Sequence, residues 1–170
     1  MLIVAAGCGS SASSGGGTST TGGKTFTIGL LTDVTGPASS GNKSSIEGVK
    51  AGTFYAARNG YTIKYVVGDT TSSPTATLAV AQKFVTQDHV SAVIAISSLT
   101  FGASAYLTAH NVPVVGAGED GPEWITSKNM FSVFGALHTT KVATTSGKFF
   151  KSQGVTNLAA IGYSVSPISS

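Results

Sequence analysis

Residues 91–100 read Ser-Ala-Val-Ile-Ala-Ile-Ser-Ser-Leu-Thr. The apolar run 92–96 is short and contains branched residues, which is typical of a buried strand. The hydroxyl residues that follow are typical of the start of a helix. Because the run is apolar at every position, it indicates a strand that is covered on both faces, as in a parallel sheet. This stretch therefore predicts a central strand that leads directly into a helix.

The same strand and helix patterns alternate along the rest of the chain. Strands are expected over residues 25–31, 61–68, 112–115, 131–134 and 157–163, and helices over residues 44–58, 74–88, 100–110 and 139–153. Ser73 is expected to cap the second of these helices, because Pro74 suits the first helical position. The connections are short enough for βαβ units, so the sequence predicts an α/β fold, a parallel sheet with helices on both faces.

Charge and hydropathy argue against nucleic acid as a partner and against a membrane-spanning helix. The chain has ten basic and seven acidic residues, a net charge of +3, and these residues are scattered along its length. No basic cluster with interleaved aromatic residues is present, so nucleic acid is not an expected partner. No apolar run approaches the roughly 20 residues of a membrane-spanning helix.

The N-terminal residues resemble a bacterial lipobox. An apolar run ends in Ala5-Ala6-Gly7, directly before Cys8, the single cysteine. Small residues at these positions suit a signal peptidase. The alternative is an ordinary core cysteine, but residues 9–23 contain only Gly, Ser, Thr and one Ala, which predicts a flexible tether. We therefore expect residues 1–8 to be a signal and lipobox remnant, with lipidated Cys8 attaching an extracytoplasmic protein to the membrane.

The signal is incomplete as it stands. The apolar run before Cys8 is shorter than about 7–15 residues and has no basic residue ahead of it. The expectation is that the true start lies upstream or that the chain is a fragment.

Candidate binding residues follow three of the predicted strands. The turn from Asp33 to Ser40, after the first strand, either contributes to the rim of a cleft or merely joins the strand to the next helix. In parallel sheets, ligands bind beyond the carboxyl ends of the strands. Ser97, Ser98 and Thr100 stand at a helix start, where hydroxyls, backbone N–H groups and the helix dipole favour an anion. An ordinary helix cap uses the same residue types, so this motif alone leaves both interpretations open.

A further candidate is the loop at residues 116–121, which spells GxGxxG. A dinucleotide site would give a nucleotide-dependent oxidoreductase. Pro122 opposes this alternative, as do the adjacent acids Glu119 and Asp120 and the lack of an acid about 20 residues later. A loop that presents backbone groups to some other ligand fits better.

Catalytic and metal-binding patterns are missing from the sequence. The histidines at positions 89, 110 and 138 are far apart, and no hydrolase elbow, P-loop or zinc motif is present. Asp69 has no catalytic partner and is predicted to brace the turn after its strand. The sequence predicts no enzyme, no cofactor and no metal.

Residues 24 to about 163 resemble the type I periplasmic binding proteins, specifically the branched-chain amino acid-binding proteins of ABC importers. The resemblance is carried by motifs in a fixed order and spacing. They are Ile28-Gly29-Leu30-Leu31 with Thr35-Gly36-Pro37, Val67-Gly68-Asp69, Val93-Ile94-Ala95-Ile96-Ser97-Ser98 and Val112-Pro113-Val114-Val115-Gly116.

The resemblance implies a fold of two lobes that close on a ligand. Residues 24–135 would form the N-terminal ligand-binding lobe, and residues 136–170 would begin a truncated second lobe, so that the chain is an N-terminal fragment. The residues that match the family's ligand-binding loops are Ser97, Ser98, Ala117, Gly118 and Glu119.

The implied function is that of a substrate-binding lipoprotein. It would bind a small amino-acid-like solute between its lobes and deliver it to the membrane subunits of an ABC permease. The alternative with the same fold is a ligand-sensing domain of a receptor or regulator.

Overall fold

The computed structural model describes residues 23–118, 121–135 and 144–161. Five strands form one sheet in the order β2-β1-β3-β4-β5, and all neighbours run parallel. The strands are β1 (Thr25–Thr32), β2 (Thr62–Asp69), β3 (Ala92–Ile96), β4 (Val114–Gly116) and β5 (Met130–Ser132). The predicted α/β fold with a parallel sheet is confirmed.

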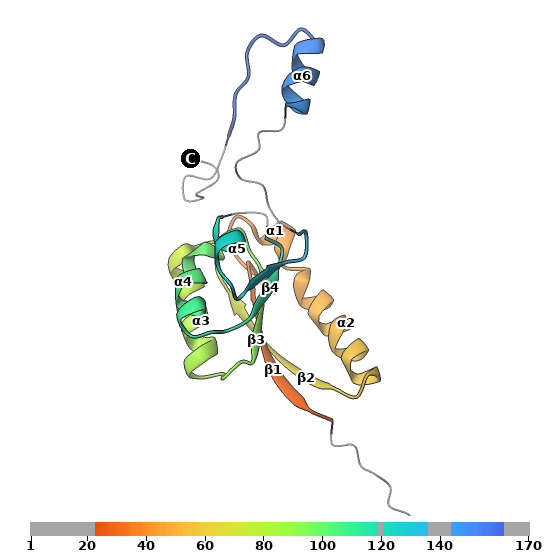
Figure 1. Ribbon diagram of the computed structural model, residues 1–170, viewed down its shortest axis with the longest axis vertical. Coiled ribbons are helices and arrows are strands. Elements are labelled where there is room, and N and C mark those ends of the chain that lie inside the picture. Colours follow the sequence, from red (N-terminus) through yellow and green to blue (C-terminus); the bar gives the residue numbers. More distant parts are fainter. Residues whose placement is uncertain (1–22, 119–120, 136–143, 162–170) are drawn as a thin grey trace, which may run out of the picture.

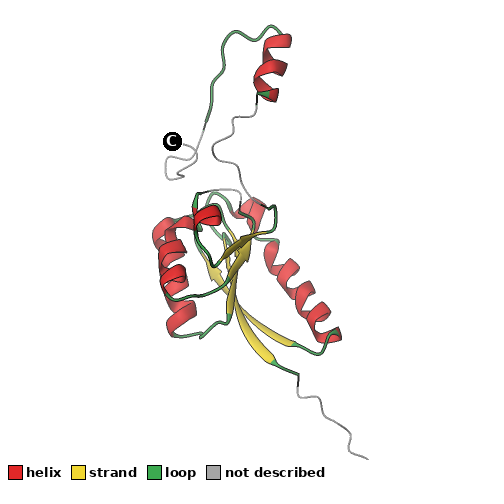
Figure 2. Ribbon diagram, viewed as in Figure 1, coloured by secondary structure: helices red, strands yellow, loops and turns green. Residues whose placement is uncertain are grey.

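Helices cover both faces of this sheet, as predicted. In Figures 1 and 2, α2 (Ser45–Arg58) lies on one side of the strands, and α3 (Pro74–Thr86) and α4 (Phe101–Ala109) lie on the other. Three further helices are α1 (Ser39–Asn42), α5 (Glu123–Thr126) and α6 (Thr145–Ser152). The sequence patterns did not predict the four-residue helices α1 and α5, because so few residues show no helical period.

The main core lies between the sheet and helices α3 and α4. Its centre is Phe84 of α3, which is 1% exposed. This ring fits because the two strand residues that it faces, Gly29 and Gly68, have no side chain. The other buried members are Leu31, Ala81, Val93, Ala95, Ala103, Leu107, Val112, Val114, Trp124 and Met130.

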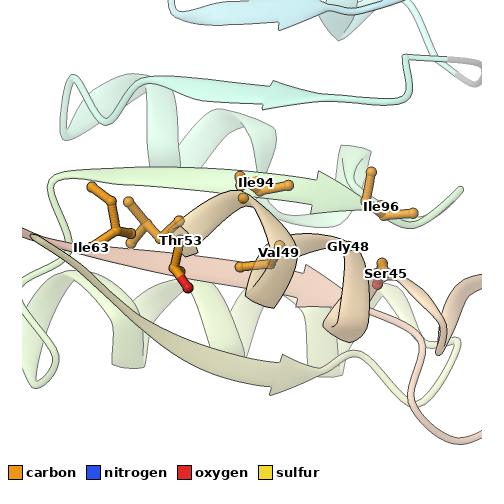
Figure 3. Close-up of a pocket in the computed structure, with 9 residues that line it drawn as sticks. Ser45, Gly48, Val49, Thr53, Ile63, Ile94 and Ile96 are labelled. Atoms are coloured by element: carbon orange, nitrogen blue, oxygen red, sulfur yellow. The ribbon is translucent and has the colours of Figure 1, made fainter. Parts of the chain in front are cut away.

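The α2 face of the sheet is packed less closely. A hollow of about 430 Å³ lies between α2 and the strands, and Gly48 and Gly52 of α2 border it. Figure 3 shows Ile94 and Ile96 of β3 at this hollow, together with Val49 and Thr53 of α2.

Further along the same face, the outer strands are open to solvent. Val115 pairs with Ile94 and Phe131 pairs with Val115, so all three side chains lie on one face. Val115 is 42% exposed and Phe131 is 54% exposed. Within the described residues, this apolar half of the sheet is therefore left uncovered.

The last part of the described chain departs from the prediction. Residues 157–161 form no strand, and the predicted strand at 157–163 is wrong there, while residues 162–163 lie outside the described ranges. All of 144–161 is exposed, including α6. A strand needs the N–H and C=O groups of a neighbour, and no described residue provides them beside this segment. The assignment of residues 136–170 to a second lobe stays a prediction.

The strand order creates a switch point at the carboxyl end of the sheet. The chain passes from β1 to β2 on one side and then returns to place β3 on the other side of β1. The loops after β1 and β3 therefore turn toward opposite faces, where ligands of α/β proteins bind. Among the described residues, no helix is long and apolar enough to cross a membrane.

Candidate functional site

A buried carboxyl group joins three strand ends at this edge. Asp33 follows β1, Thr70 follows β2 and Ser97 follows β3, and all three are buried. The Thr70 and Ser97 hydroxyls both donate to Oδ1 of Asp33, the latter at 3.2 Å. Asn42 of α1 donates from Nδ2 to Oδ2 at 2.7 Å. We call these four side chains the Asp33 hub.

Two hydroxyls of the Asp33 hub also hold the backbone of the loops that follow. Ser97 Oγ accepts the N–H of Leu99 at 3.1 Å, and Thr70 Oγ1 accepts the N–H of Ser72 at 3.4 Å. Each hydroxyl thus donates a hydrogen bond to Asp33 and accepts a hydrogen bond from a backbone N–H of its own loop. The loops 70–73 and 97–100 are in this way tied to a single buried group.

Asp69 braces the turn after its own strand through the N–H of Thr71, as predicted, and it also holds the loop after β1, which was not predicted. Its Oδ1 accepts the N–H groups of Val34, Thr35 and Thr71 at 2.9–3.1 Å, and its Oδ2 accepts the Thr35 hydroxyl at 2.6 Å. Burial raises the pKa of the Asp69 carboxyl, but the hydrogen bonds from Thr35, Thr71 and Val34 outweigh it and hold the pKa below its ordinary value.

The structure distinguishes the three hydroxyl residues predicted after β3. Ser97 and Thr100 are buried, and their protons are already donated, that of Ser97 to Asp33 and that of Thr100 to the Ser97 carbonyl at 2.6 Å. Ser98 is half-buried, and neither its hydroxyl nor its N–H forms a hydrogen bond with another described residue. Since a hydroxyl has one proton to donate, Ser98 is the member of this group with a donor for an anion.

The second predicted loop lies beside the first, because β3 and β4 are neighbours in the sheet. The N–H of Ala117 donates to the Ala95 carbonyl at 3.2 Å, and the N–H of Gly118 donates to the Gly116 carbonyl at 3.1 Å. Both amides therefore shape the loop itself. Glu119 lies outside the described residues.

Packing and backbone geometry account for the glycines of the GxGxxG pattern. A Cβ on Gly116 would lie 2.0 Å from the Ala95 carbonyl oxygen, and one on Gly118 would lie 2.8 Å from the Trp124 ring. Gly121 has a φ of +90°, in the left-handed region that favours glycine. The spacing thus arises from close packing and a turn.

Sequence reasoning missed the Asp33 hub. Asp33 and Thr70 are 37 residues apart, and Asp33 and Ser97 are 64 residues apart. Nothing in local periodicity links positions so distant. The one available signal is that each polar residue directly follows a predicted strand, and in a parallel sheet these ends meet at one edge.

Solved structures with the same fold include several solute-binding proteins. The leucine-binding protein LivK of Thermotoga maritima is 20% identical, with a TM-score of 0.58 over 64% of this chain and 32% of that chain. LivJ of Streptococcus pneumoniae, in complex with isoleucine, is 22% identical, with a TM-score of 0.58 over 64% and 33%. A solute-binding protein of R. palustris, in complex with 4-hydroxybenzoate, is 17% identical, with a TM-score of 0.56 over 64% and 31%.

These likenesses concern the fold, and the chain spans about a third of the length of the solved structures. No curated protein matches the sequence. The model of the family described as "Periplasmic binding protein" matches residues 25–169, nearly the whole sequence. The chain therefore belongs to the periplasmic binding protein family, whose members bind solutes and are not enzymes.

Proposed function

We propose that this chain is part of a lipid-anchored receptor that binds a small carboxylate-bearing solute, such as an amino acid, and delivers it to an ABC permease. Family membership implies an extracytoplasmic location and removes the oxidoreductase alternative. The observation that carries the proposal is Ser98, which leaves a hydroxyl and an N–H without a described partner at the start of α4.

The chemistry of this position suits a carboxylate. The N-terminal end of a helix has a partial positive charge, which favours an anion. At the start of α4 the N–H groups of Gly102 and Ala103 already donate to the carbonyls of Leu99 and Thr100 at 3.0 Å. The Ser98 hydroxyl and N–H are therefore the donors that would hold an anion there. Isoleucine and 4-hydroxybenzoate, bound by two proteins of the same fold, differ in their side groups but both carry a carboxylate. The shared group is the one that Ser98 and the start of α4 would hold.

The remaining predicted residues take supporting roles in this proposal. Ser97 and Thr100 shape the loop that presents Ser98, because their protons are donated within the protein. Ala117 and Gly118 lie in the neighbouring loop, and these two residues and Glu119 would contact the rest of the solute. Glu119 would favour an ammonium or amide group on that solute, since its charge repels a second carboxylate.

Replacing Ser98 with alanine is expected to weaken solute binding by about 1–3 kcal/mol, roughly 5- to 150-fold in Kd, the range for a lost hydrogen bond to a charged group. The measurement is calorimetric titration of isoleucine and 4-hydroxybenzoate into the protein expressed from its complete reading frame. Ser91→Ala is the matched control, because Ser91 lies exposed just before the opposite end of β3. Equal affinities for Ser98→Ala and the parent would contradict the proposed contact.

The lipid anchor is tested separately at Cys8. In a bacterial host, the mature protein is expected to begin at a lipid-modified Cys8, because Ala5-Ala6-Gly7 provides the small residues that a lipoprotein signal peptidase requires. Mass spectrometry of the N-terminal peptide measures this. An unmodified Cys8, or cleavage at another bond, would rule out the lipid anchor. Neither result would bear on the proposed solute site.

A further inference from the structure

We infer that Asp33 is a positioning residue of the proposed solute site, because its buried carboxyl orients Ser97, which in turn sets the course of the loop that carries Ser98. This inference rests on the proposed function, but it concerns a residue that makes no contact with solute. It assigns a role to a buried acid that would otherwise have none.

A fully buried carboxyl group is costly to fold unless donors surround it. Asp33 is 0% exposed, and the two ion pairs of the described residues lie elsewhere, at Lys50–Glu47 and Lys83–Asp88. Its partners are instead three donors from three different segments, Asn42, Thr70 and Ser97. In an Asp33→Asn variant, an NH2 group would replace one carboxylate oxygen, so that a donor would face the donors that surround this position.

Through its position, Asp33 constrains the loop that carries Ser98. The Ser97–Asp33 hydrogen bond joins the ends of β3 and β1, the two strands that flank the switch point. Because the Ser97 hydroxyl donates a hydrogen bond to Asp33, its oxygen is oriented to accept the N–H of Leu99. This bond spans Ser98, so it constrains the backbone on both sides of the proposed contact residue.

The hub also couples this loop to its neighbour. Thr70 repeats the arrangement of Ser97, because it donates to Asp33 and accepts the N–H of Ser72. Ser72 in turn accepts the N–H of Ala38 at 3.0 Å. The loops after β1, β2 and β3 are therefore all linked through the Asp33 carboxyl group, while Asp69 adds a second link between the first two, and Ser98 is presented on a preorganised edge.

The test compares Asp33→Asn with the parent in the protein from its complete reading frame. We expect at least a tenfold rise in Kd for isoleucine or 4-hydroxybenzoate, and at least tenfold faster hydrogen exchange at the Leu99 N–H. The Val93 N–H, bonded to the Pro113 carbonyl within the sheet, should exchange as in the parent. If Asp33 acts through Ser97, the double variant with Ser97→Ala should lose no more affinity than Ser97→Ala alone.

Two controls separate positioning from general stability. Thr77→Val removes another fully buried hydroxyl, which donates to the Ser73 carbonyl, and should leave the Kd within twofold. If Asp33→Asn does not fold, Ser97→Ala cuts the same link while Asp33 keeps Thr70 and Asn42, and the same rise in Kd and in Leu99 exchange is expected.

An unchanged Kd together with unchanged Leu99 exchange in Asp33→Asn or Ser97→Ala would overturn the inference. Independent, additive losses in the double variant would overturn it as well. A parent protein that binds neither probe would contradict the proposed function instead. The Leu99 exchange rate would then still show whether Asp33 holds the loop.

Discussion

Replacing Phe84 with alanine is expected to lower the free energy of unfolding by about 3–5 kcal/mol. Phe84 is 1% exposed and packs at the centre of the core between α3 and the sheet. Truncation removes its buried apolar surface and leaves a cavity that the rigid strands cannot close. Urea unfolding followed by circular dichroism measures the loss.

The glycines opposite Phe84 make this prediction sharper. A Cβ on Gly29 would lie 2.5 Å from Phe84 Cδ2, so Gly29→Ala should cost about 1–3 kcal/mol in the parent through overpacking. In the Phe84→Ala background the cavity accepts the new methyl group, and the cost should disappear. If the stability losses of the two single variants simply add in the double variant, the Phe84 ring does not fill the space that Gly29 leaves open.

Gly52→Ala is the control for the same change in an open site. No atom lies within 4 Å of a Cβ built on Gly52, which is exposed on α2. Alanine is the better helix former, so this variant should gain up to about 1 kcal/mol of stability. Opposite signs at Gly29 and Gly52 would confirm that local space, and not the loss of glycine, determines the outcome.

Replacing Trp124 with alanine in the parent protein is expected to lower the free energy of unfolding by about 3–5 kcal/mol. Trp124 is 7% exposed in α5, and Gly116 and Gly118 leave room for its ring. The indole therefore packs between the core and the loop after β4. Its removal should both destabilise the fold and loosen the loop that carries Ala117 and Gly118.

The neighbouring residue provides the control for Trp124. Ile125 belongs to the same helix but is 45% exposed, so Ile125→Ala should cost less than about 1 kcal/mol. Unfolding should again be followed by circular dichroism, because Trp124 is the single tryptophan and its removal abolishes the fluorescence signal. Similar losses for Trp124→Ala and Ile125→Ala would contradict the assigned packing.

Much of the fold could be predicted because its signals are local. The run at 25–31 predicts β1, which spans Thr25–Thr32. Ser73 and Pro74 predict the start of α3, where the Ser73 side chain accepts the N–H of Ala76 at 3.5 Å. A cap needs only residues within one turn, and a buried strand shows its burial in its own composition. Such features can be recognised without knowledge of their neighbours.

The strand expected at 157–163 shows the limit of local signals. Residues 157–161 belong to a mostly apolar run but lie exposed without a neighbouring strand in the described structure. Propensity describes how well side chains fit a pleated surface, while the strand itself exists only when another strand supplies hydrogen bonds. That second requirement lies outside the segment.

The sequence by itself determined the α/β class and the parallel sheet, and it indicated candidate binding residues at the carboxyl ends of the strands. Only the tertiary structure distinguished Ser98 from Ser97, two identical neighbours in the sequence. The difference comes from Asp33, 64 residues before Ser97, whose carboxyl accepts a hydrogen bond from the Ser97 hydroxyl, whereas the Ser98 hydroxyl has no acceptor among the described residues. A hydroxyl can donate only one hydrogen bond, and the strand order of the sheet decides which residue lies close enough to accept it.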